Sequence, residues 1–409
     1  MKPNVLRLSK VLFMVLFICL IIYSIQELEY LETFKIIQPA EAEYPNSFCN
    51  CKPRIARYIE NINEAILPEY IDFSKVKKGD YVGKSTCNNY TSALGAGQNV
   101  LSYSLYNPPR ALTGEILELD AWDTKYIELI EDIIPHAEMY YPGWRIRIYH
   151  NITRLEPDRM TRQELCRLYC TYHLIDLCDV TNLPSVGNLN ERSPVGRLWR
   201  FQPAGDPTVD AFACRDIDSY MLDREVFAVK DWLKSPHQYH IMRDGPFHTM
   251  FGMLAGMWGG RNYQNMTLAL EVRKAYMRVQ PSEAKSSDQD VLISEVYPLL
   301  RDFSLIHDSH GCVSGLVGAN MAPYPTRRVG FTFVGYGPSW NHMMWALANS
   351  PCPVECRPPN HQVYIHILAS SPCPVECRPP NHQVYIHILA SSPCPVECRP
   401  PNHQDWDYC

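Results

Sequence analysis

Hydrophobic and polar positions in the middle of the chain follow two different periods. Residues 100–106 (VLSYSLY) and 144–150 (WRIRIYH) alternate as a β-strand does, whereas residues 116–135 and 161–175 carry apolar side chains at helical spacing. Strands that alternate with helices of this length predict an α/β fold with a mostly parallel sheet and helices on both of its faces. In such sheets, ligands bind beyond the carboxyl ends of the strands.

A further apolar run, residues 209–214, ends in two aspartates one residue apart, Asp216 and Asp218. The next segment has helical spacing, and we predict that this helix begins near Met221. Two carboxylates so close together repel each other and resist burial unless a positive group lies between them. The pattern leaves three candidates open: a metal ion, a nearby arginine, or water, with Asp218 capping the helix in the last case.

The N-terminal segment is a candidate membrane anchor. Residues 11–25 are uncharged and strongly apolar, and Lys2, Arg7 and Lys10 precede them. Fifteen residues fall below the roughly 17–25 that a spanning helix needs, so a cleaved signal peptide and a secreted product form the alternative. Positive charge on the N-terminal side predicts a single transmembrane helix of type II orientation, with the rest of the chain in the lumen of the Golgi or the ER.

Cysteines and glycosylation signals agree with a luminal location. The chain has 16 cysteines and three Asn-x-Thr sequons, at Asn89, Asn151 and Asn265. Zinc is the alternative for Cys166 and Cys170, but no matching pair completes a four-ligand set, so we expect disulfides. The net charge of -6 and the lack of a long basic run give no support for nucleic-acid binding.

The C-terminal tail contains a tandem repeat. Residues 350–370 recur unchanged as residues 371–391, and their first thirteen residues recur again from Ser392. Such complete identity favours a copied cysteine-containing tail, or an error of gene assembly, over a metal-binding array. The chain is thus expected to comprise a cytoplasmic tail (1–10), a signal anchor (11–25), a luminal stem (26–95), a catalytic domain (96–345) and a Cys/Pro-rich tail (346–409).

The D-x-D pattern alone is weak evidence for a metal site, since this chain contains it three times. The pair Asp216 and Asp218 differs from the others because it follows a predicted strand of an α/β domain. Carboxylate oxygens suit the hard ions Mn²⁺ and Mg²⁺. An ion held there would bridge the phosphates of a nucleotide and neutralise the charge that builds on a leaving diphosphate.

Two longer segments carry a resemblance to a known family. WRFQPAGDPTVDAFACRDIDSYMLDREVFAVKDWL and HIMRDGPFHTMFGMLAGMWGG resemble GT-A-type nucleotide-sugar glycosyltransferases, in particular a bacterial and invertebrate group with RDxDS and HxMRD motifs. The resemblance covers about residues 99–340 and is strongest over residues 199–260. Gly245 departs from the pattern, which has histidine there. The resemblance implies a GT-A-like, Rossmann-like fold and transfer of a sugar from a UDP- or GDP-linked donor to a glycan, protein or lipid acceptor.

The same resemblance implies roles for several residues. Asp216 and Asp218 would hold Mn²⁺ or Mg²⁺ and the sugar nucleotide, and His307 would be a further metal ligand. Arg215 would pair with a carboxylate or contact phosphate, and Ser219 completes the substrate-binding RDxDS motif.

Two interpretations remain open for each of four further residues. Arg243 and Asp244 contact the donor sugar or form structural ion pairs, and Trp258 stacks on a sugar or fills the core. Asp288 deprotonates the acceptor hydroxyl as a catalytic base, or caps a helix.

Two other classes of function remain open: a catalytically inactive luminal binding or scaffold protein with the same fold, and a metal-dependent luminal phosphodiesterase or hydrolase. Binding of a nucleotide diphosphate separates a transferase from a hydrolase, and turnover separates it from a scaffold.

Overall fold

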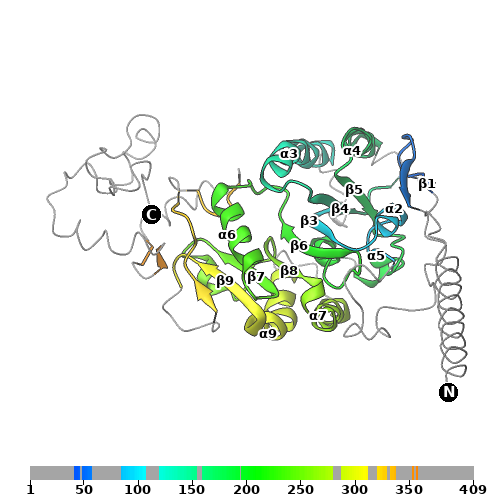
Figure 1. Cartoon of the computed structure of the whole chain (residues 1–409). Helices are drawn as coiled ribbons and strands as arrows, with labels where there is room; N and C mark the ends of the chain where they lie inside the picture. The colour runs from blue at the N-terminus through cyan, green and yellow to red at the C-terminus, as the bar shows by residue number, and fades with distance from the viewer. Residues whose placement is uncertain are drawn as a thin grey trace, which may run out of the picture.

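A computed structural model describes residues 41–46, 48–57, 84–106, 119–153, 159–193, 195–279, 287–311, 320–328, 332–337, 352–353 and 356–357. Its centre is an eight-stranded sheet with the strand order β10-β9-β7-β8-β6-β3-β4-β5 (Figure 1). The strands are β3 (Gln98–Leu105), β4 (Arg145–His150), β5 (Ile175–Asp179), β6 (Val209–Arg215), β7 (Tyr239–Arg243), β8 (Met257–Arg261), β9 (Ser304–Asp308) and β10 (Met321–Ala322).

The sheet is mostly parallel, as its sequence pattern predicts. Only β8, which lies between β6 and β7, pairs antiparallel with its neighbours in this sheet. The other pairings, β3 with β4 and β6, β4 with β5, and β9 with β7 and β10, are parallel. Because β8 runs against β6, the start of β8 lies at the edge where β6 ends, and this edge carries Asp216.

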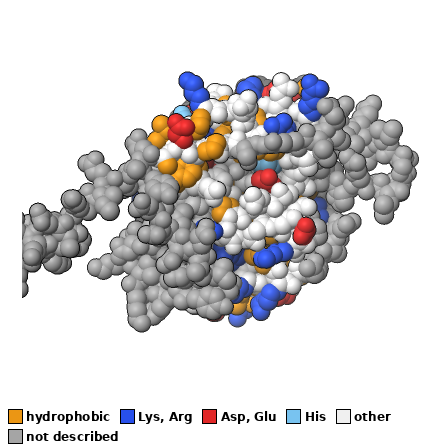
Figure 2. All heavy atoms as spheres, turned by 90° about the vertical axis from the view of Figure 1, so that its right-hand side faces the viewer, with side chains coloured by type: hydrophobic (Ala, Val, Ile, Leu, Met, Phe, Trp, Pro, Cys, Tyr) orange, Lys and Arg blue, Asp and Glu red, His pale blue; other side chains and the backbone are white. Residues whose placement is uncertain are grey.

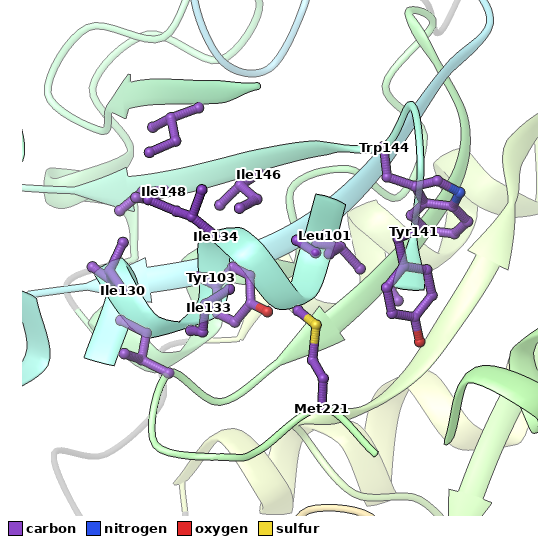
Figure 3. Close-up of a cluster of buried hydrophobic side chains, with 14 of the residues drawn as sticks. Leu101, Tyr103, Ile130, Ile133, Ile134, Tyr141, Trp144, Ile146, Ile148 and Met221 are labelled. Carbon is purple, nitrogen blue, oxygen red and sulfur yellow. The ribbon is translucent and has the colours of Figure 1, made fainter. Parts of the chain in front are cut away.

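One face of the sheet is covered by three helices, α3 (Leu119–Tyr140), α4 (Arg159–Thr171) and α6 (Asp223–Lys234). Alternate strand residues point to opposite faces. Leu101 and Tyr103 of β3 therefore pack with Ile130 and Ile134 of α3 in one apolar cluster (Figure 3). These side chains are at most 2% exposed, so this face forms a continuous core.

The opposite face is covered by helices that follow β8 in the chain, together with one short helix that precedes β6. This layer contains α7 (Met266–Arg278), α8 (Ser287–Val291), the π-helical turn η6 (Leu292–Val296), α9 (Tyr297–Leu300) and the 3-10 helix η3 (Gly196–Phe201). Val100, Phe212 and Ile241 supply the strand side of this second core. Shorter elements are α5 (Leu189–Arg192), η4 (His248–Met250), η5 (Asn262–Gln264) and η7 (Arg301–Phe303).

An N-terminal segment is fastened to the sheet domain by disulfides. The hairpin of β1 (Glu41–Tyr44) and β2 (Arg54–Arg57) precedes α2 (Asn89–Ala93). Disulfides join Cys49 to Cys166, Cys51 to Cys170, and Cys87 to Cys178. Cys166 and Cys170 therefore belong to disulfides, as expected.

The structure corrects one prediction of secondary structure. Helical spacing over residues 161–175 predicts one helix, but α4 ends at Thr171 and Ile175 begins β5. The helix expected near Met221 is confirmed as α6, which begins at Asp223. The glycine-rich residues 252–260 include most of β8.

Within the described residues, no helix combines the length and hydrophobicity that crossing a bilayer requires. The anchor predicted at residues 11–25 and the repeats from residue 358 onward lie outside the described residues.

Candidate active site at the carboxyl ends of β3 and β6

Asp216 and Asp218 lie in the turn directly after β6. The backbone N–H of Ser219 donates to the carbonyl oxygen of Asp216 at 3.2 Å, which closes this turn. Both aspartates are half-buried, and the side chain of Asp216 is 41% exposed. The sequence thus places two solvent-accessible carboxylates at the edge of a parallel sheet where ligands bind.

Arg200 is the positive group that faces Asp216. Its guanidinium donates one hydrogen bond to Oδ1 of Asp216 and another, 3.0 Å long, to Oδ2 of Asp288. Hydrogen bonds fix the backbone of Arg200 against β3, because Ser104 Oγ accepts from its N–H at 2.8 Å and Ser102 Oγ donates to its carbonyl at 2.6 Å. Of the three partners left open for Asp216, the described residues supply an arginine.

Asp288 reaches this site from α8, where it lies in the first turn. It is 6% exposed, and burial raises the pKa of its carboxyl group although Arg200 favours the charged form. Arg197 Nε lies 3.7 Å from its other oxygen. A carboxylate whose pKa is raised by burial holds a proton more readily, which suits a group that exchanges protons with a substrate.

Two tyrosines complete the described part of the site. Burial raises the pKa of Tyr126, on α3, to about 12, and the charges of Asp218 and Asp216 contribute in the same direction. Burial also raises the pKa of Tyr106, which follows β3, although Arg197 opposes this shift. Both phenols therefore keep their protons at neutral pH, Tyr126 beside Asp218 and Asp216, and Tyr106 beside Asp288.

Two glycines allow the chain to approach these aspartates closely. A Cβ atom built on Gly256 would overlap the carboxylate of Asp216, and one built on Gly337 would overlap the carbonyl oxygen of Asp218. Gly256 directly precedes β8, so the antiparallel direction of this strand brings it to the end of β6. The site needs residues without a side chain at these positions.

Arg215 does not pair with either aspartate of the motif. It is 1% exposed and forms an ion pair with Glu225 of α6, and it also donates to the carbonyl of Tyr220 at 3.0 Å. Tyr141 donates to Glu225 at 3.0 Å. Arg215 thus pairs with a carboxylate, one of the two expected alternatives, inside the core and away from solvent. Ser219, 6% exposed, donates to the carbonyl of Gly335 at 3.3 Å.

Arg243 and Asp244 form separate buried ion pairs. Arg243 Nε lies 2.6 Å from Oδ2 of Asp308. Asp244 accepts two hydrogen bonds from Arg224, at 2.9 and 3.0 Å, and one from Arg328 at 2.9 Å. The two arginines hold the pKa of Asp244 well below its usual range despite burial. Arg243 and Asp244 thus form structural ion pairs, which was the alternative to contact with the donor sugar.

Trp258 and His307 lie outside the cluster around Asp216. Trp258 is 1% exposed and packs edge-to-face on Phe201 and Phe212. It therefore fills the core, the second of the two interpretations given for it. His307 Nδ1 lies 2.8 Å from Nε2 of His240, and its Nε2 lies 3.2 Å from Asp231. The ring of His307 thus uses both nitrogens within the face covered by α6, so the structure does not bring it to Asp216 as a metal ligand.

The described residues contain no group of three or more His, Cys, Asp or Glu side chains arranged to hold a metal ion. Two half-buried carboxylates nevertheless fit Mg²⁺ or Mn²⁺, because such ions are commonly bound through one or two carboxylates, with water and substrate phosphates as the other ligands. Gly256 allows the chain to pack directly against the Asp216 carboxylate, and Asp216 and Asp218 are the residues that would hold the ion.

Sequence reasoning missed Arg200, Tyr106 and Tyr126. Arg200 stands in the WRF segment, and its only sequence signal is a charged residue within an apolar stretch, which predicts a buried charge that needs a partner. Tyr106 is the last residue of the strand predicted over residues 100–106, and residues at such strand ends are candidates for ligand contact. Nothing in the pattern of α3 marks Tyr126.

Comparison with known proteins does not assign this site to a family. The sequence matches no family model and no curated protein.

Proposed function

We propose that the protein is a divalent-metal-dependent glycosyltransferase that moves a sugar from a UDP- or GDP-linked donor to a hydroxyl group of a glycan, protein or lipid. The observation that supports this proposal is the cluster of Asp216, Asp218, Arg200 and Asp288 at the carboxyl edge of a mostly parallel sheet. We also propose that the α/β fold is of the GT-A-like type.

Each described group has a role in this reaction. Mn²⁺ or Mg²⁺ held by Asp216 and Asp218 would neutralise charge on the leaving diphosphate. Arg200 orients the Asp216 carboxylate and adds positive charge beside it. Asp288, with its raised pKa, accepts the proton of the attacking acceptor hydroxyl as the bond between the sugar and the diphosphate breaks. The nucleoside diphosphate leaves, and the acceptor oxygen is joined to the sugar.

The proposal places this enzyme in the Golgi or ER membrane, with residues 11–25 as its anchor and the catalytic domain in the lumen. The three disulfides support the luminal part, because such bonds persist in oxidising compartments. A luminal location also agrees with the three sequons.

The test is a calorimetric titration of the full-length protein with UDP and with GDP, each with and without Mn²⁺. We expect one nucleotide to bind in a Mn²⁺-dependent manner, and the double variant Asp216→Ala/Asp218→Ala to lose this binding. The matched control is Asp132→Ala/Glu138→Ala, which removes the same charge from an exposed part of α3. Binding without Mn²⁺ that survives the aspartate variant would refute the metal site. A folded protein that binds neither nucleotide would favour a luminal scaffold.

A further inference from the structure

A cavity lies at the carboxyl edge of the sheet, in addition to the candidate active site. It has a volume of about 310 Å³ and is lined by the ends of β4 and β5, the start of α2 and the N-terminal segment that includes Tyr44 and Phe48. Ligand sites range over roughly 300–1,000 Å³, so this cavity suits a small ligand. β4 is two strands from β6, so these two strands lie about 10 Å apart in the sheet.

His150, the last residue of β4, is the unusual group in the wall of this cavity. Its side chain is fully buried, yet neither ring nitrogen has a hydrogen-bond partner among the described residues. Buried polar groups nearly always have such a partner, so this ring needs an explanation. Burial lowers the pKa of His150 to about 4, and the neutral ring offers one donor and one acceptor.

Other polar side chains of the cavity divide into two sets. Asn46 and Asn88 use their side-chain oxygens to accept from backbone N–H groups, at 2.8 to 3.0 Å, so they shape the wall. Asp179 accepts from Thr181 only through Oδ1, and the side chain of Asn182 makes no hydrogen bond to a described residue. The second oxygen of Asp179 and the amide of Asn182 are therefore available to a ligand.

The cavity also has aromatic walls and little charge. The rings of Tyr44 and Tyr90 are 6.3 Å apart, and Phe48 packs on His150 at 4.7 Å. Among the described residues of its lining, Asp179 is acidic and none is lysine or arginine. Figure 2 shows the side of the molecule that carries β1, α2 and α5, where the middle of the described surface is largely uncharged. The guanidinium carbons of Arg54 and Arg145 lie 5.3 and 5.6 Å from the centroid of the Tyr90 ring, and both groups form ion pairs with Asp176.

We propose that this cavity binds a neutral saccharide unit, with His150, Asp179 and Asn182 as hydrogen-bond partners of its hydroxyl groups and Tyr44 and Tyr90 against its C–H faces. Aromatic faces combined with a few fixed polar groups match a hydroxylated ring, which is apolar on its faces and polar at its rim. This site is separate from the proposed donor site and does not depend on the proposed transfer reaction.

The test is saturation-transfer NMR on the full-length protein after enzymatic removal of N-glycans, because Asn89 of a sequon borders the cavity. The probes are glucose, galactose, mannose, fucose, xylose, N-acetylglucosamine and N-acetylgalactosamine, with glucose 6-phosphate and sialic acid as charged comparators. We expect saturable binding of at least one neutral sugar. His150→Phe, which keeps a ring without its nitrogens, and Asn182→Ala should each weaken it about tenfold, the effect of losing a good hydrogen bond.

Two controls separate the possible outcomes. Asn190→Ala removes an asparagine of α5 that does not line the cavity, and Asp216→Ala/Asp218→Ala disables the proposed donor site; both should keep saccharide binding. Asn182 is exposed, so its variant remains informative if His150→Phe does not fold. The proposal is overturned if no neutral sugar binds, if a charged comparator binds more tightly, or if the His150 and Asn182 variants bind as the wild type does.

Discussion

The buried ion pair of Arg215 and Glu225 offers a quantitative test of how the end of β6 is held. Both side chains are fully buried, and Arg215 directly precedes Asp216. Burial raises the pKa of Glu225 although Arg215 favours its charged form. Glu225→Leu would leave the Arg215 guanidinium buried without its carboxylate, which costs about 3–5 kcal/mol of unfolding free energy. Tyr141 also loses its acceptor, worth about 1 kcal/mol.

Replacing both charged residues distinguishes the cost of one unpaired buried charge from the net contribution of the ion pair to the free energy of unfolding. The double variant Arg215→Met/Glu225→Leu leaves an apolar contact of similar size, and such replacements are often neutral or stabilising. We therefore expect it to recover at least about 2 kcal/mol relative to Glu225→Leu. The matched control is the exposed pair of Arg167 and Glu131, 2.8 Å apart, where Glu131→Leu should change stability by less than about 1 kcal/mol.

The assay is urea denaturation with the disulfides intact, in which a shift of the midpoint at constant slope reports stability. The reasoning fails if Glu225→Leu costs less than about 1 kcal/mol, since an unpaired buried charge must cost more. It also fails if the double variant is no more stable than the single one.

Two further predictions concern Gly256 and the buried histidines. Gly256→Ala should weaken Mn²⁺-dependent nucleotide binding about tenfold or more by calorimetry, because its Cβ overlaps the Asp216 carboxylate, and unchanged binding would contradict this contact. Lowering the pH from 6.5 to 4 should destabilise the protein, because burial lowers the pKa of His150 to about 4 and of His248 to about 3, so the unfolded chain binds these protons first. His150 contributes about 3 kcal/mol to this loss. Urea denaturation at both pH values should show a smaller loss for His150→Gln, and an equal loss would refute the assignment.

The strands that sequence reasoning predicted are those with regular alternation, and β8 shows why others were missed. β8 contains Gly259 and Gly260, and glycine weakens a strand pattern. Both glycines are required by neighbours, since a Cβ on Gly259 would overlap the carbonyl of Phe212 and one on Gly260 would press on the ring of Tyr239. The tertiary contact that demands glycine thus removes the local signal of the strand.

The candidate site was predictable only where its residues follow strand ends. Asp216 and Asp218 could be placed because they follow an apolar run. The contact of Arg200 with Asp216 and Asp288 depends on hydrogen bonds between η3 and β3 across nearly a hundred residues, which no local pattern contains. His307 shows the opposite case, because the pairing of β7 with β9 brings it to His240.

The disulfides that fasten the N-terminal segment impose an order on biosynthesis. Cys49 and Cys51 leave the ribosome well before their partners, since 117 and 119 residues separate the two pairs. During that interval the cysteines of this chain with which they can pair are each other, Cys19 and Cys87, so native pairing must wait for α4 or replace an earlier bond. The N-terminal segment is therefore fixed in place late, and the wall that it contributes to the cavity beside β4 and β5 is completed only after Cys170 has been made.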